Sequence, residues 1–259
     1  MSSTIASRFS ISQQGVGVLV ALFASAVVFR LLRKPRNNDE PEHSSHIVPP
    51  NSATQEVCAT LRLQFPDISY GPEDVGFWSH LKYWSSQARI PTPALVVQPR
   101  STDQLSQIVK ILAEAVKSST GDNTVRFAIK SGGHNPVQGF ANVESGVMIT
   151  LSHLVAIELS EDHRLVTIEP GATWGSVYRK LQRYGLAVAG GRASSVGVGG
   201  LTLGGGLSFF SPQVGFVCDN TQEFEVVLAD GSVVIASEQS HPDLAIALRG
   251  TFRVDSFYQ

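Results

Sequence analysis

Cysteine is scarce in this sequence, and its scarcity excludes several kinds of site. The two cysteines, Cys58 and Cys218, lie far apart, so they cannot form a disulfide framework, a CxxC redox motif or a cysteine-based metal site. One isolated disulfide and two buried free thiols both stay open. His153 and His163 have no partner at ligand spacing, so surface or structural roles are favoured for them and no metal site is predicted.

A strong excess of charge of one sign is also absent. The chain has 20 Lys and Arg residues against 22 Asp and Glu residues. Because neither sign forms a long block, no nucleic acid partner is expected. The sequence also lacks GxxxxGK[ST], a GxGxxG that follows a strand, GxSxG and HExxH. A phosphate-bearing ligand would therefore need another kind of loop.

Long hydrophobic runs are limited to the N-terminal region. Residues 15–29 carry no charge, and Leu31 and Leu32 extend the run. After a tail at 1–14, residues 15–32 are predicted to be a transmembrane helix that anchors the chain in a membrane by a single pass. Basic residues after it favour a cytosolic downstream side. The alternative is a secretory signal cleaved near Ala24–Ala26, although the chain has no Asn-x-Ser/Thr sequon.

The rest of the chain divides into a linker at 33–54, an N-terminal extension at 55–89 and a larger domain at 90–259. The linker is polar, rich in proline and without periodicity. Apolar periodicity and capping residues predict helices from Glu56, from about 102 to 115, and over 174–184 after Thr173. Strands are expected at 94–97, 126–129, 147–151, 165–168, 223–228 and 233–236, the last two joined by an Asp-Gly turn. Helices and strands do not alternate strictly, so the predicted class is α+β.

Two glycine-rich segments are the candidates for chemistry. The first is Ser131–His134, and the second runs from Gly190 to Gly206. Glycine is costly inside apolar segments, and it is used where the backbone turns sharply or approaches a ligand closely. Exposed backbone N–H groups in such loops bind anions, above all phosphate. A ligand with a diphosphate is expected, and ordinary turns are the alternative.

Three stretches together resemble a known family. They are KSGGHNPVQGF, GGRASSVGVGGLTLGGGLSFFSPQVGFVCDN and HPDLAIALRG. They are similar to the FAD-binding domain of the vanillyl-alcohol-oxidase or p-cresol-methylhydroxylase (PCMH-type) flavoproteins, in particular the berberine-bridge-enzyme-like fungal oxidoreductases. The resemblance implies two α+β subdomains around an extended FAD. It also implies a small-molecule substrate that gives a hydride to the flavin, and O2 that reoxidises it. No protein partner is predicted.

The resemblance assigns roles to individual residues. His134 matches the histidine that bonds covalently to the flavin 8α-methyl group. Many relatives carry a second attachment through a cysteine, but Ala193 stands at that position here, so FAD attached only through His134 is expected. The segment around Cys218 predicts a small buried side chain. The other predicted cofactor-binding residues are Ser131, Gly132, Gly133, Asn135, Gly139, Gly191, Ser195, Gly197, Gly200, Thr202, Gly204, Gly205 and Gly206.

The sequence departs from the family pattern after Gly250. Relatives continue with further glycines that line the flavin and then with a substrate domain, whereas this sequence reads TFRVDSFYQ. The substrate domain is therefore expected to be missing, and no catalytic residue is assigned. One interpretation is an FAD-linked oxidoreductase acting on a secondary metabolite, an alcohol or a sugar. The others are a truncated, inactive flavin-binding remnant and a membrane-tethered structural protein.

Overall fold

The computed structural model describes residues 48–250. The predicted membrane segment at 15–32 lies outside these residues, and within them no helix is long and apolar enough to cross a bilayer. The helices are α2 (Ser52–Gln64), α3 (Phe77–His80), α4 (Thr102–Ser118), α5 (Trp174–Gln182), α6 (Val198–Leu203), α7 (Ser211–Val214) and α8 (Pro242–Leu248). The strands are β1 (Ser69–Tyr70), β2 (Leu95–Val97), β3 (Phe127–Lys130), β4 (Val147–Thr150), β5 (Ile157–Leu159), β6 (Val166–Ile168), β7 (Glu223–Val227) and β8 (Val233–Ser237). Short 3-10 turns lie at Pro66–Ile68, Gln87–Arg89, Gly121–Asn123 and Cys218–Asn220.

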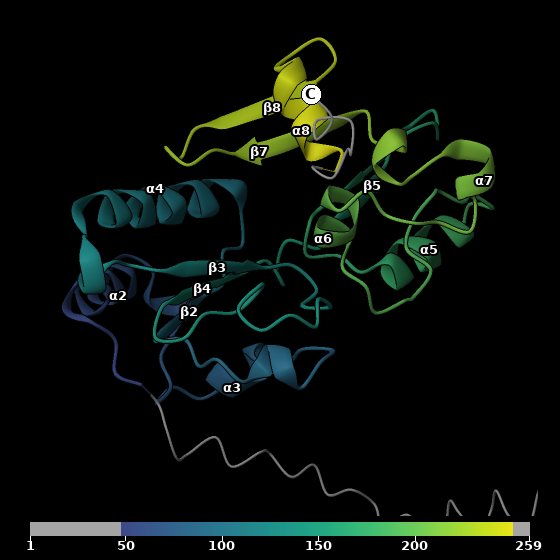
Figure 1. Ribbon diagram of the computed structural model, residues 1–259. Coiled ribbons are helices and arrows are strands. Elements are labelled where there is room, and N and C mark those ends of the chain that lie inside the picture. The colour runs from purple at the N-terminus through teal and green to yellow at the C-terminus, as the bar shows by residue number, and fades with distance from the viewer. Residues whose placement is uncertain (1–47, 251–259) are drawn as a thin grey trace, which may run out of the picture. The chain divides into compact units, whose positions relative to one another are not determined.

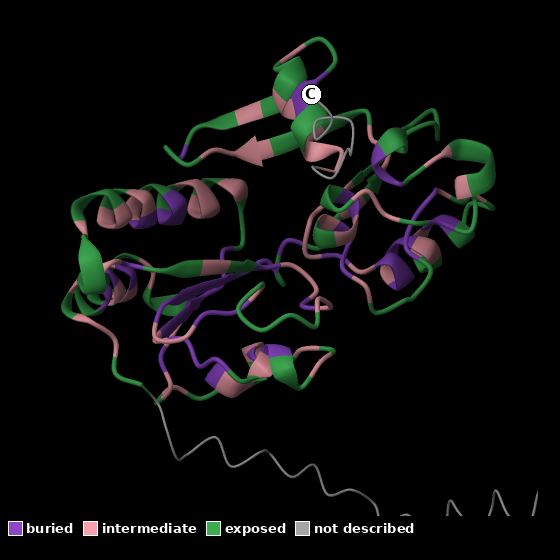
Figure 2. Cartoon of the chain, viewed as in Figure 1, coloured by how far each residue is buried: buried purple, intermediate pink, exposed green. Residues whose placement is uncertain are grey.

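A four-stranded sheet in the order β1-β2-β4-β3 forms the first half of the described chain. Strands β2, β4 and β3 run parallel, and β1 pairs with β2 antiparallel. Side chains alternate between the two faces of the sheet. Leu95 and Val147 pack with residues of α2 and α4, whereas Val96 and Met148 pack with Phe77 of α3. Both faces of the central strands are therefore covered, which is typical of parallel strands (Figures 1 and 2).

Helix α4 connects β2 to β3 and confirms the predicted strand-helix unit. Its N-cap is Ser101, whose side chain accepts a hydrogen bond from the backbone N–H of Gln104 at 3.2 Å. Ile108, Val109 and Leu112 recur at helical spacing and are all buried against the sheet. The apolar stripe read from the sequence is thus the face that builds the main core.

Helix α2 begins earlier than the sequence predicts. Ser52 to Thr54, in the stretch predicted as linker, already form its first turn. Asn51 is the N-cap, and its Oδ1 accepts a hydrogen bond from the Thr54 N–H at 2.8 Å. Asparagine and serine are common both in linkers and at helix N-caps. The polar stretch that indicates a linker therefore also includes the start of α2.

A second core cluster lies in the part that holds the second glycine segment. Trp174 and Val177 of α5 pack there with Val198 of α6, and side chains from the antiparallel pair β5–β6 join them. Helix α5 ends close to the predicted position, where Gly185 takes a φ of +66°. Strand β5 was not predicted.

The predicted hairpin near the end of the described chain is present as β7–β8. Gly231 in its turn has a φ of +83°, which the Asp-Gly pair provides. The hairpin contacts α4, since Thr102 donates to the carboxylate of Glu225 at 2.8 Å (Figure 1). Parallel strands with a crossover helix, together with antiparallel hairpins, make the described chain α+β as predicted.

Candidate functional site

The first glycine segment directly follows β3. It therefore lies at the carboxyl end of a parallel strand, which is where open sheets of this kind hold their ligands. Gly133 has a φ of +62°, a conformation that favours glycine. A Cβ at Gly133 would also come within 2.8 Å of Lys130 Cε and 3.0 Å of Tyr83 Cδ1. Both the backbone conformation and the packing therefore require glycine there.

The two glycine segments contact each other directly through their backbones. A Cβ on Gly132 would lie 2.6 Å from the backbone nitrogen of Gly197, and a Cβ on Gly197 would lie 2.5 Å from the nitrogen of Gly132. The Ser131 hydroxyl donates to the carbonyl of Pro170, which lies just after β6. Two segments that are far apart in the sequence thus form one cradle of bare backbone.

The second segment is held in place by the start of α5. The N–H of Trp174 donates to the Val196 carbonyl at 3.0 Å, and the N–H of Gly175 donates to the Ser194 carbonyl at 3.0 Å. A Cβ on Gly191 would lie 2.6 Å from Trp174 Cδ1, so the indole ring occupies the space of a side chain. The indole Nε1 is itself buried and has no hydrogen-bond partner among the described residues.

His134 lies where the two segments meet. Its ring stacks on the ring of Trp84, with centroids 4.9 Å apart and planes 15° from parallel. Its Nε2 lies 3.3 Å from the hydroxyl oxygen of Ser195. The half-buried imidazole of the first segment is therefore held by Trp84, which lies much earlier in the chain, and by Ser195 of the second segment.

Tyr83 and Trp84 are site residues that the sequence reasoning missed. The backbone N–H of Trp84 donates to the carbonyl of Gly133 at 3.2 Å. The Tyr83 hydroxyl donates to the carbonyl of Ala141 at 2.9 Å, and its ring lies against Gly133. Two adjacent aromatic residues in a polar stretch were the available signal. Their contact with the loop could not be read from the sequence, because about 50 residues separate them from it.

Lys130 lies beneath the same loop and is 6% exposed. Its ammonium group donates to the carbonyl of His80 and lies 4.4 Å from the centre of the Tyr83 ring. Burial, and then the positive charge of Lys82, lower the pKa of Lys130 from 10.5 to about 8. The ammonium group beneath the loop therefore loses its proton at a lower pH than an exposed lysine does.

Other predicted cofactor residues use their side chains for local structure. The Asn135 Oδ1 accepts a hydrogen bond from the N–H of Val137 at 2.9 Å, and Gly139 lies exposed in the same loop with a φ of +79°. The hydroxyl of Thr202 is buried and donates to the Val198 carbonyl at 2.8 Å within α6. These contacts give both polar side chains a structural partner.

The glycines of the segment 200–206 differ in what their surroundings require. Gly205 and Gly206 have φ values of +89° and +78°, so the turn itself favours glycine. At Gly204 a Cβ would come no closer than 3.4 Å to another atom. Gly200, in α6, has open space around a Cβ and an ordinary φ. Local structure therefore does not explain Gly200, whereas close approach of a ligand would.

Both cysteines and two further histidines complete the residues that the sequence analysis considered. Cys58 and Cys218 are free thiols, and Cys218 is buried as predicted. Burial raises the pKa of Cys58 from 9.0 to about 11. His153 and His163 are exposed, and the described part of the chain contains no group of His, Cys, Asp or Glu side chains that could hold a metal ion.

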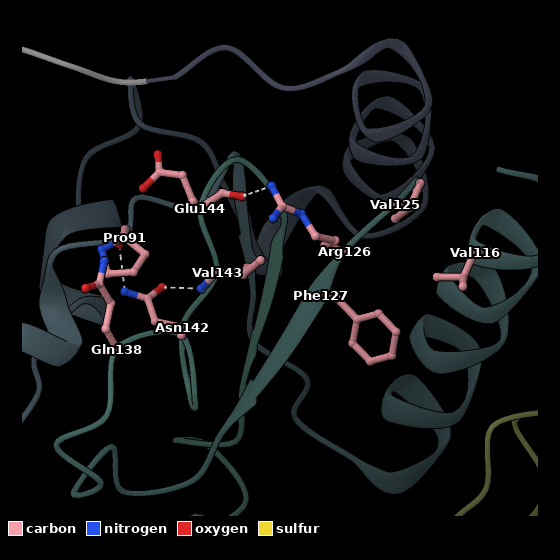
Figure 3. A pocket seen from close by; sticks show the side chains of 10 residues that line it. Pro91, Val116, Val125, Arg126, Phe127, Gln138, Asn142, Val143 and Glu144 are labelled. Carbon is pink, nitrogen blue, oxygen red and sulfur yellow. Dashed lines mark hydrogen bonds between the residues drawn. The ribbon is translucent and has the colours of Figure 1, made fainter. Parts of the chain in front are cut away.

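A hollow of about 680 Å³ lies beside β3 (Figure 3). Arg126, Phe127 and Gln138 are among the residues that line it, together with Gly139 of the predicted set. The Arg126 guanidinium donates to the carbonyl of Glu144 at 3.3 Å. His134 and the glycines of the cradle are not among its lining residues, so the hollow is separate from the contact between the two segments.

Comparison with known proteins gives a consistent set of relatives. The chain is 41% identical over 168 residues to the FAD-dependent monooxygenase tpcD of Cochliobolus heterostrophus, a match that covers 65% of this chain and 31% of that protein. It is 39% identical over 217 residues to the FAD-dependent monooxygenase FUP4 of Fusarium proliferatum, covering 80% of this chain and 40% of that protein. The chain thus spans well under half the length of these relatives.

Solved structures of FAD-containing oxidases are also similar to this chain. The glucooligosaccharide oxidase of Acremonium strictum, which carries a 6-S-cysteinyl, 8α-N1-histidyl FAD, is similar with a TM-score of 0.64 and 28% identity. The similarity covers 76% of this chain and 39% of that one. The FAD binding domain family matches residues 93–237, which include both glycine segments, His134 and Ser195. The chain therefore belongs to the family of flavoproteins with this FAD binding domain.

Proposed function

We propose that this chain is the cofactor-binding part of a berberine-bridge-enzyme-like FAD-linked oxidoreductase and that it holds FAD covalently through His134. The observation that carries the proposal is the direct backbone contact of Gly132 with Gly197, with the imidazole of His134 beside it. Family membership and the FAD-dependent relatives support the same ligand.

The residues of the cradle fit a dinucleotide. Backbone without side chains lets a diphosphate approach closely, and N–H groups of such loops stabilise its negative charge. His134 offers a ring nitrogen at the rim, and Trp84 covers one face of that ring. When bound, FAD supplies the acceptor for a hydride from the substrate. The protein residues then position the cofactor and keep its attachment point in place.

A single covalent attachment is proposed. The similar oxidase of Acremonium strictum carries both a cysteinyl and a histidyl bond. Here Ala193 stands where the resemblance places that cysteine. Cys218 is buried and Cys58 lies in α2, so neither takes its place. His134 is therefore the proposed sole covalent tether.

The proposed substrate is a small molecule such as a secondary metabolite, an alcohol or a sugar, with O2 as the final electron acceptor. The related structures include oxidases of xylooligosaccharides and chitooligosaccharides, which favours this class. No residue of this chain is assigned as the catalytic base. For that reason a flavin-binding chain without turnover is the second candidate.

We also propose that residues 15–32 tether the chain to a membrane, on the basis of their uncharged apolar run. Secretion after cleavage is the competing outcome. Carbonate extraction of membranes from cells expressing the full chain separates the two: an uncleaved anchor stays in the pellet, whereas a cleaved form appears in the medium with a shortened N-terminus.

Covalent flavin is the direct test of the main proposal. The full chain is produced with riboflavin, precipitated with acid and run on a denaturing gel. We expect flavin fluorescence to remain with the protein and to disappear in His134→Ala, whereas a matched His153→Ala variant keeps it. Protein without bound flavin after incubation with excess FAD would contradict the proposal. Substrate-dependent H2O2 production, measured separately, distinguishes an enzyme from a flavin-binding chain.

A further inference from the structure

The two nitrogen-bearing edges of the His134 ring are not equivalent in their surroundings. The ring of Trp84 stacks on it at 15° and fixes the plane of the imidazole. A half-turn about the Cβ–Cγ bond would keep that plane but exchange Nδ1 with Cδ2 and Nε2 with Cε1. Stacking alone therefore leaves open which nitrogen faces a ligand.

Ser195 removes this ambiguity. Its hydroxyl oxygen lies 3.3 Å from Nε2 of His134. A neutral imidazole has one nitrogen that donates and one that holds a lone pair. When Nε2–H donates to the serine oxygen, the lone pair is on Nδ1. The contact thus orients the ring, and in the tautomer with Nε2–H it leaves the Nδ1 lone pair free for a new bond.

The position of Ser195 is itself well defined. The carbonyl of Ser194 accepts the N–H of Gly175, and the carbonyl of Val196 accepts the N–H of Trp174, each at 3.0 Å. Both neighbours of Ser195 are thus tied to the first turn of α5. The Ser195 side chain itself is exposed, so its hydroxyl is free to turn between accepting and donating.

We propose that Ser195 is the positioning residue for flavin attachment and that it directs Nδ1 of His134 to the flavin 8α carbon. This inference rests on the proposed function. The new bond joins Nδ1 to the 8α carbon, and one C–H bond of the methyl group breaks. One proton leaves the methyl group and one leaves Nε2, while the two electrons of the C–H bond pass to O2 and give H2O2. Nε2 then holds a lone pair, to which the Ser195 hydroxyl donates.

The experiment follows attachment itself and needs no substrate. The full chain is produced under riboflavin limitation and mixed with FAD in air, and acid-stable flavin is measured over time. We expect Ser195→Ala to attach flavin about tenfold more slowly, the factor that corresponds to one lost hydrogen bond. Ser195→Thr keeps a hydroxyl and should restore the rate. Ser194→Ala removes a neighbouring exposed hydroxyl and should leave the rate unchanged.

The linkage isomer gives a second readout that a structural role for Ser195 would not change. Histidyl-flavin isolated by proteolysis is analysed by NMR. We expect the Nδ1 isomer from the wild type and a mixture of Nδ1 and Nε2 isomers from Ser195→Ala. Equal rates and a pure Nδ1 product from Ser195→Ala would overturn this inference alone. Absence of acid-stable flavin in the wild type would overturn both it and the covalent linkage proposed for His134.

Discussion

The burial of Lys130 is expected to make the stability of this protein rise with pH above neutrality. Its pKa is lowered from 10.5 to about 8. Between these values the unfolded chain holds a proton that the folded chain has lost. Because the unfolded state then binds more protons, the free energy of unfolding increases with pH. The whole interval corresponds to about 3 kcal/mol, at about 1.4 kcal/mol for each pH unit.

Two other groups act in the opposite direction and must be separated. Burial raises the pKa of Cys58 from 9.0 to about 11, and it raises the pKa of Tyr83 above its usual value. The folded state holds these protons longer than the unfolded chain, so their contributions to stability fall above about pH 9 and pH 10 respectively. A single pH profile of the wild type would therefore mix the three effects.

The comparison that isolates Lys130 is wild type against Lys130→Met, both in a Cys58→Ala background. Urea unfolding followed by tryptophan fluorescence gives the free energy of unfolding at pH 7, 8, 9 and 10. The difference between the two proteins should stay constant from pH 7 to about 8 and then change by about 1 kcal/mol per pH unit, in favour of the wild type. Lys117→Met, at an exposed position, should show no such trend. A flat difference from pH 7 to 10 would refute the reasoning.

Three further substitutions test packing in the described chain. Gly132→Ala places a Cβ 2.6 Å from the Gly197 nitrogen and should lower the free energy of unfolding by about 1–3 kcal/mol in urea; an unchanged midpoint would show that the segments are not in contact. Gly200→Ala should instead stabilise the protein without ligand by about 0.5–1 kcal/mol while reducing flavin retention, and unchanged retention would rule out close approach of the cofactor there. Asn142 donates from its side-chain amide to the buried carbonyls of Ala88 at 3.1 Å and Pro91 at 2.7 Å. Asn142→Ala should lower the free energy of unfolding by about 3 kcal/mol, and a loss below about 0.5 kcal/mol would contradict the assigned bonds.

Much of the secondary structure could be predicted from the sequence. The stripe of Ile108, Val109 and Leu112 with its Ser101 cap predicts α4, and the Asp-Gly pair predicts the β7–β8 turn. Both signals are local, so they survive without any knowledge of the fold. The helices α6 to α8 were not predicted, because four to seven residues carry too little helical periodicity, and β5 was also not predicted.

The candidate site could be predicted only in its parts. The sequence by itself identified both glycine segments and His134, because glycine composition and a family motif can be read without coordinates. It could not place Gly132 against Gly197. It also could not show that Trp84 stacks on the face of the His134 ring or that Ser195 contacts its Nε2. Those contacts join residues about 50 to 65 positions apart. These contacts depend on packing between segments that are far apart in the sequence, and only the tertiary structure shows that packing.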